Sequence, residues 1–161
     1  MLSQWPLWTF GASTSFLWYP VDEEKEWRWE FLGFESVQEG QPVQVWFDGL
    51  PEEVRDEIRD LLNFLGKMTG TLWRRPEFDG LVGAGGISEL RPQEVSVPRN
   101  EEIETETYRI YGCFPKDRKH TYLFLHGKRK GVKNDKPGKR TAKRRLKQFE
   151  RGDASAHKFE F

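Results

Sequence analysis

A dense run of cationic side chains near the C-terminus is the part of this sequence best suited to bind an anion. Residues 128–147 contain 11 lysines and arginines but only one acidic residue, Asp135. Many charge runs form only a solvated surface, but this excess of cations goes beyond what solubility requires. Clustered cations release condensed counterions from a polyanion. The run therefore predicts phosphate binding, with a solvated face as the alternative.

Charge is divided unevenly along the chain, although basic and acidic side chains number 26 each. Residues 1–106 hold 9 basic and 21 acidic side chains, whereas residues 107–161 hold 17 basic and 5 acidic ones. Such a division indicates either a basic surface for an anionic partner or two faces that neutralise each other in the fold.

Length and composition exclude several classes of protein. A chain of 161 residues with 14% aromatic side chains is long and apolar enough for one folded domain. Cys113 is the only cysteine and the three histidines lack a paired context, so we expect no disulfide scaffold, no metal site and no cofactor. The sequence has no apolar run of about 18 residues that would predict a membrane span.

The chain divides into three expected parts. Residues 1–24 form an aromatic extension without the basic start and continuous apolar core of a secretory signal. This extension is expected to pack on the domain or on a partner. The alternative is that it is artificial or upstream sequence that does not belong to the domain. Residues 25–151 form the domain, and 152–161 a C-terminal tail.

Hydrophobic periodicity predicts the elements of the domain. Helices are expected over 42–47, from Pro51 to Gly66 or Gly70, and from Lys139 to about Arg151 after a break at Pro137 and Gly138. Strands are expected over 27–32, 87–91, 107–114 and 121–126, and the last two should pair as an antiparallel hairpin. Residues 80–86 read as a glycine-rich turn that lacks a phosphate-loop motif, and residues 93–106 as an exposed acidic loop.

The order of these pieces resembles the RelE/ParE superfamily, and most of all the phage-derived, HigB-like toxins of type II toxin–antitoxin systems. The resemblance covers residues 25–149. It is carried by the segments 27–31, 42–51, 80–81, 89–91, 108–110 and 125–127, together with the long helix and the lysine-rich turn that follows His126.

This resemblance implies an α+β fold with an antiparallel sheet, an N-terminal helical pair and a basic C-terminal helix. It implies a cytoplasmic toxin that cuts mRNA on the ribosome, inhibits translation and is neutralised by a helix-turn-helix antitoxin. A non-catalytic module of the same fold, including a gyrase-targeting toxin, is the alternative. The oligomeric state is left open.

The resemblance also assigns candidate site residues. Arg91 and Arg109 match family arginines that contact the scissile phosphate. The alternative for each is a structural ion pair, for example with Glu89 or with a glutamate of the acidic loop. The ordinary pKa of histidine would suit His126 for acid–base catalysis, and a structural role is the alternative. Lys128 and Lys130 would lie beside the phosphate. Additional RNA contacts are expected from Arg129, Lys133, Arg140, Lys143, Arg144 and Lys147.

Two departures from the family pattern bear on activity. Lys128 replaces the usual aromatic residue after the His-Gly step, and the acidic segment 93–106 is longer than usual. That segment either covers the basic face or lies far from the site.

Overall fold

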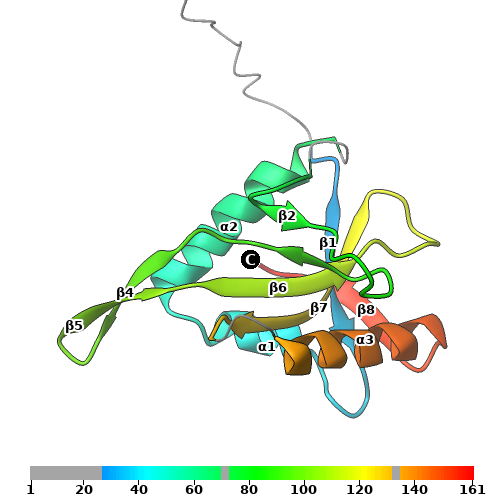
Figure 1. Cartoon of the computed structure of the whole chain (residues 1–161). Helices are drawn as coiled ribbons and strands as arrows, with labels where there is room; N and C mark the ends of the chain where they lie inside the picture. The colour runs from blue at the N-terminus through cyan, green and yellow to red at the C-terminus, as the bar shows by residue number, and fades with distance from the viewer. Residues whose placement is uncertain (1–26, 70–72, 132–134) are drawn as a thin grey trace, which may run out of the picture.

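The computed structural model describes residues 27–69, 73–131 and 135–161, so the predicted extension 1–24 and Lys133 lie outside the described residues. A six-stranded sheet forms the centre of the molecule (Figure 1), in the order β2-β3-β6-β7-β1-β8. β1 and β7 are parallel, and the other neighbouring strands are antiparallel. The predicted α+β class is confirmed. The bounds of the six strands are β1 Glu30–Glu35, β2 Phe78–Asp79, β3 Ser88–Leu90, β6 Tyr108–Cys113, β7 Thr121–Arg129 and β8 Ser155–Lys158.

In the ranges that the structure describes, three helices cover the two faces of this sheet. α1 (Pro42–Asp48) and α2 (Glu52–Gly66) pack on one face against the buried rings of Phe31, Tyr122 and Phe124. The predicted apolar stripe of α2 is confirmed, since its Val, Ile and Leu side chains at spacings of three and four are buried. α3 (Lys136–Glu150) packs on the opposite face through Ala142 and Leu146.

The start of α3 differs from the prediction. The helix begins at Lys136, not at Lys139, because Asp135 caps it by accepting a hydrogen bond from the Gly138 backbone N–H at 3.0 Å. Pro137 sits in the first turn, where a backbone N–H has no helical partner to lose. A Cβ on Gly138 would lie 2.0 Å from the Asp135 carboxylate, so the glycine belongs to the cap.

The predicted antiparallel pairing of β6 and β7 is confirmed, with one irregularity that matters for the site. Tyr111 pairs with His126, but Gly112 pairs with Phe124, so Leu125 is an extra residue in β7. Such a bulge shifts the alternation of side chains between the two faces. Leu125 packs in the core beneath α3, and the His126 ring stacks on Tyr111 on the same face. Lys128 then also points toward α3.

Two other stretches differ from expectation at the ends of the sheet. The first strand begins at Glu30 instead of residue 27, and it is buried on both faces because β7 and β8 flank it while helices lie above and below. β8 was not among the predicted strands. It pairs antiparallel with β1 and leads into Phe159, which is buried against Phe124.

The acidic segment 93–106 is a β-hairpin, not the predicted exposed loop. β4 (Val95–Arg99) and β5 (Glu102–Glu106) pair in register and project beyond the sheet (Figure 1). Val97 is buried in the core formed with α2, and the Glu106 side chain is fully buried. The segment is therefore anchored at its base by apolar and ionic contacts.

Gly127 marks a close approach between β7 and α1. A Cβ on this residue would lie 2.3 Å from the Trp46 ring. Gly127→Ala is therefore expected to lower the free energy of unfolding by about 1–3 kcal/mol, because the indole must move. Denaturant unfolding measures the change, with Gly131→Ala as the control, since a Cβ there meets no atom of the described residues within 4 Å. Equal stabilities of the two variants would contradict the close packing.

Candidate functional site

A small pocket of about 190 Å³ opens on the sheet face that carries α3. It lies between β3, β6, the end of β7 and the first turn of α3. Its lining combines cations, carboxylates and one phenol: Leu81, Glu89, Arg91, Arg109, Tyr111, Lys130, Asp135 and Lys139. Three of the five predicted catalytic residues, Arg91, Arg109 and Lys130, thus meet in one concavity.

Strand register explains why these residues converge. Glu89 of β3 pairs with Tyr111 of β6, and Arg109 of β6 pairs with Lys128 of β7. Residues two apart in a strand share a face, so Arg109 and Tyr111 point the same way. The bulge in β7 brings Lys128 and Lys130 to that face as well.

Arg109 is the least neutralised guanidinium in the pocket. Its side chain is only 14% exposed, and its Nε forms an ion pair with a Glu89 oxygen at 3.8 Å, which is beyond hydrogen-bond distance. The ion pair considered as the alternative role for Arg109 is therefore present. Nη1 donates to the Tyr108 carbonyl at 2.8 Å, and Nη2 has no hydrogen-bond partner among the described residues. Burial lowers the pKa of Arg109, because the charged form is poorly solvated. An anion that enters the pocket would stabilise the charged guanidinium in place of the water that burial excludes.

Arg91 is already engaged by carboxylates. Its Nε donates to Glu89 and its Nη2 to Asp79, each at 2.6 Å. Asp79 also accepts a hydrogen bond from Arg75 at 2.7 Å. The ion pair with Glu89, considered as the alternative role for Arg91, is thus present in the structure. Arg91 still lines the pocket and adds to its positive charge.

Asp135 connects the first turn of α3 to the sheet. It accepts hydrogen bonds from Lys128 Nζ at 2.7 Å and from the Tyr111 hydroxyl at 2.9 Å, in addition to capping the helix. Burial by itself would raise the pKa of Asp135, but these hydrogen bonds lower it overall. Burial and the Asp135 carboxylate raise the pKa of Tyr111. Lys128 therefore holds the helix in place and does not line the pocket.

His126 lies behind the pocket and outside its lining. Its ring stacks on that of Tyr111, with centroids 6.4 Å apart, and its Nδ1 is 3.4 Å from Arg145 Nη1. Burial lowers the pKa of His126, and the nearby Arg145 cation acts in the same direction. The imidazole is therefore mostly neutral near pH 7. The geometry favours the structural role considered for this residue.

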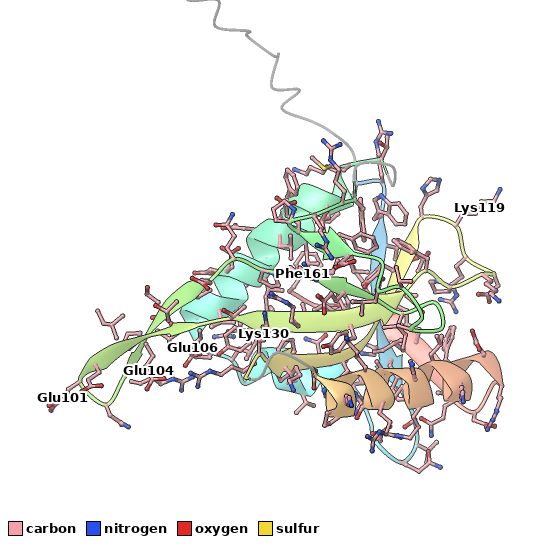
Figure 2. All side chains as sticks on the ribbon, viewed as in Figure 1. Glu101, Glu104, Glu106, Lys119, Lys130 and Phe161 are labelled. Atoms are coloured by element: carbon pink, nitrogen blue, oxygen red, sulfur yellow. The ribbon has the colours of Figure 1, made fainter. Side chains whose placement is uncertain are left out.

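The acidic hairpin contacts one predicted RNA-binding residue. Arg129 pairs with Glu104 at 3.1 Å and with Glu106 at 3.3 Å, on the opposite side of β7 from Lys128 and Lys130. Figure 2 shows Glu101, Glu104 and Glu106 along this hairpin. None of its residues is among those that line the pocket, which leaves the pocket open.

Among the cations of α3 that do not line the pocket, some are held by a carboxylate and others are not. Arg144 and Arg145 both bind Glu39 of the turn after β1, with N–O distances of 3.0 Å, and Arg145 also donates to the Leu125 carbonyl at 2.7 Å. Arg140, Lys143 and Lys147 are exposed and have no side-chain partner among the described residues.

The ion pairs of Glu39 with Arg144 and Arg145 connect α3 to the turn after β1. They predict that part of the protein's stability depends on pH. Hydrogen bonds from Arg144 and Arg145 lower the pKa of Glu39 from 4.5 to about 2. A carboxyl group whose pKa is lowered in the folded state stabilises the protein at pH values above its ordinary pKa. This stability is lost as the pH falls toward the pKa of the folded state. Glu39→Gln is expected to melt at a lower temperature than the wild type at pH 7.

The difference in melting temperature should shrink steadily between pH 4.5 and pH 2. Thermal unfolding followed by circular dichroism over this range measures it. Glu94→Gln, which alters an exposed carboxylate without a side-chain partner among the described residues, is the control. A Glu39→Gln deficit that stays constant down to pH 2 would contradict the ionic origin of the effect.

Sequence reasoning did not place five of the pocket residues among the site residues: Leu81, Glu89, Tyr111, Asp135 and Lys139. Glu89 was considered only as an ion-pair partner, although it lies two residues before Arg91 and therefore on the same face of the chain. Lys139 was visible as one cation among eleven, but no local signal distinguishes it from its neighbours.

A larger hollow of about 880 Å³ lies at the other end of α3. Its floor is apolar and includes Cys113, Leu146 and Phe149, while Lys116 and Glu150 stand among the charged residues that also line it. Burial raises the pKa of Cys113 to about 12, so this thiol stays protonated. None of the predicted site residues lines this hollow.

In the described parts of the chain, no group of three His, Cys, Asp or Glu side chains is placed to hold a metal ion. No helix of the same ranges is long and apolar enough to cross a membrane. Comparison with protein-family models, with curated proteins and with solved structures found no match for this chain.

Proposed function

We propose that the chain is a RelE-like toxin of a type II toxin–antitoxin system, a cytoplasmic endoribonuclease that cuts mRNA on the ribosome. A helix-turn-helix antitoxin would neutralise it. The observation that carries this proposal is Arg109, a recessed guanidinium whose Nη2 has no hydrogen-bond partner in the described parts of the chain. It belongs to a pocket that is also lined by Arg91, Lys130 and Lys139. Arginine suits a phosphodiester because its planar fork can donate two hydrogen bonds to neighbouring oxygens.

RNA cleavage by internal transfer needs a base, a cationic cradle for the phosphate, and an acid. In our proposal the Glu89 carboxylate takes the proton of the 2′-hydroxyl while the 2′-oxygen bonds to phosphorus. The bond from phosphorus to the 5′-oxygen breaks, and Lys130 donates a proton to that oxygen. Arg109 and Arg91 stabilise the negative charge that develops on the phosphate. The products are a 2′,3′-cyclic phosphate and a 5′-hydroxyl end.

A non-catalytic module of the same fold is the second candidate, and specific contacts favour it. Arg91 is held by two carboxylates, Lys128 by Asp135, and His126 lies outside the pocket. A pocket arranged in this way still binds phosphate, or an acidic protein target such as part of gyrase. It would do so without proton transfer.

Induction of the protein in bacterial cells, followed by mapping of new RNA 5′ ends, tests the two candidates. The nuclease predicts growth arrest together with new 5′-hydroxyl ends inside translated regions. The same ends should appear when purified protein, ribosomes and mRNA are combined. Growth arrest with intact transcripts would support the non-catalytic candidate. An absence of both effects would overturn the toxin proposal.

A further inference from the structure

Lysines on one flank of α3 continue the positive charge of the pocket along the helix. Lys139, Lys143 and Lys147 are spaced four residues apart, and such residues lie on the same side of an α-helix. Lys139 lines the pocket, whereas Lys143 and Lys147 are exposed toward the C-terminal end of α3. The three therefore form a stripe, called here the lysine stripe, that begins at the pocket wall.

The lysine stripe is available to a ligand, in contrast to the other flank of α3. Arg144 and Arg145 are held by Glu39, and Arg145 is 8% exposed. Among the described residues, no carboxylate pairs with any of the three lysines of the stripe. A row of unpaired ammonium groups attracts a linear polyanion, whose negative charges also follow one another at regular spacing.

The dimensions of the pocket indicate a single strand as this polyanion. A volume of about 190 Å³ admits one phosphodiester but no base pair. Arg109, 14% exposed, is reached only by a backbone that bends into the concavity. Four residues of α-helix rise about 6 Å, and flexible lysine stems can adjust to consecutive phosphates of an extended strand.

We infer that single-stranded RNA leaves the pocket along α3, with successive phosphates paired to Lys139, Lys143 and Lys147. This inference rests on the proposed function, because it takes the phosphate at Arg109 as the starting point of the path. According to this inference, the lysine stripe binds the RNA backbone next to the site of cleavage, independently of the base sequence.

Fluorescence anisotropy with 2′-O-methyl oligoribonucleotides tests the path, since these RNAs lack the attacking hydroxyl. Affinity is expected to rise with oligonucleotide length until the RNA spans the lysine stripe, and then to level off. For single strands, the slope of log affinity against log salt changes by about 0.7 for each phosphate contact. Single Lys139→Gln, Lys143→Gln and Lys147→Gln variants should each flatten the slope by about that amount, and the triple variant by about 2.

Lys119→Gln is the matched control, because this exposed lysine lies on the β6–β7 loop, away from the hairpin and Lys130 (Figure 2). It should keep the wild-type slope. Unchanged slopes in the stripe variants, with RNA still bound, would overturn the path but leave the pocket as the binding site. Equal affinity for a duplex would also overturn it. If no RNA binds at any length, the proposed function fails together with the path.

Discussion

Arg109→Ala is expected to slow RNA cleavage by at least about 100-fold and to relieve growth arrest, because removing one preorganised donor to a reacting oxyanion has effects of this size. Of the two arginines that line the pocket, Arg109 has the donors that are least used within the protein, so its loss costs few internal contacts. Single-turnover cleavage by the purified variant measures the rate. The unfolding transition of the variant should stay close to that of the wild type, since burial already disfavours this cation.

Two further variants show whether the geometry of Arg109 matters beyond its charge. Arg109→Lys is expected to recover only part of the rate, because an ammonium group lacks the planar fork of guanidinium. Arg28→Ala removes an exposed arginine that is absent from the pocket lining, and it should cleave like the wild type. Wild-type cleavage by Arg109→Ala would show that the reaction takes place elsewhere.

Glu106→Gln is expected to be the most destabilising polar substitution in the hairpin, with a loss of about 2–3 kcal/mol. The Glu106 side chain is fully buried and accepts hydrogen bonds from Arg99, at 2.9 Å, and from the buried Tyr108 hydroxyl. Arg129 forms a further ion pair with it. A glutamine would turn an amide donor toward these donors and leave at least one of them unpaired in the interior.

The expected readout is a fall in melting temperature of roughly 5–10 °C. Arg99 and Tyr108 lower the pKa of Glu106, against the effect of burial, so its contribution is present above the ordinary carboxyl pKa and is lost as the pH falls. Glu101→Gln at the exposed hairpin tip is the control and should melt like the wild type. Equal melting temperatures for the two variants would show that the buried carboxylate contributes no stability.

Elements with a strong local pattern are the ones that sequence predicts correctly. α2 and the β6–β7 pair each carry their own signal, an apolar stripe in one case and alternation followed by a turn in the other. The β4–β5 hairpin and β8 were missed because their stability comes from partners distant in sequence. Val97 packs in the core with α2, and β8 pairs with a strand more than 100 residues earlier in the chain.

The residues of the candidate site also differ in whether local sequence predicts their role. Sequence placed Arg91, Arg109 and Lys130 among the site residues, and the structure brings them to one pocket. It could not show which of the predicted cations are already bound by carboxylates, as Arg91, Lys128 and Arg129 are. One extra residue in β7 decides which side chains of 125–130 face α3, and a bulge of this kind has no clear signature in a single sequence.

What the amino-acid sequence determined by itself is the type of each element with a strong local pattern and the gathering of positive charge in the last third of the chain. Periodicity and charge density are local properties, and they can be read without knowing the fold. Only the tertiary structure decided which cations are neutralised by carboxylates and which remain to meet an anion. That outcome depends on strand register and on turns such as the one carrying Glu39, which bring together groups more than 100 residues apart.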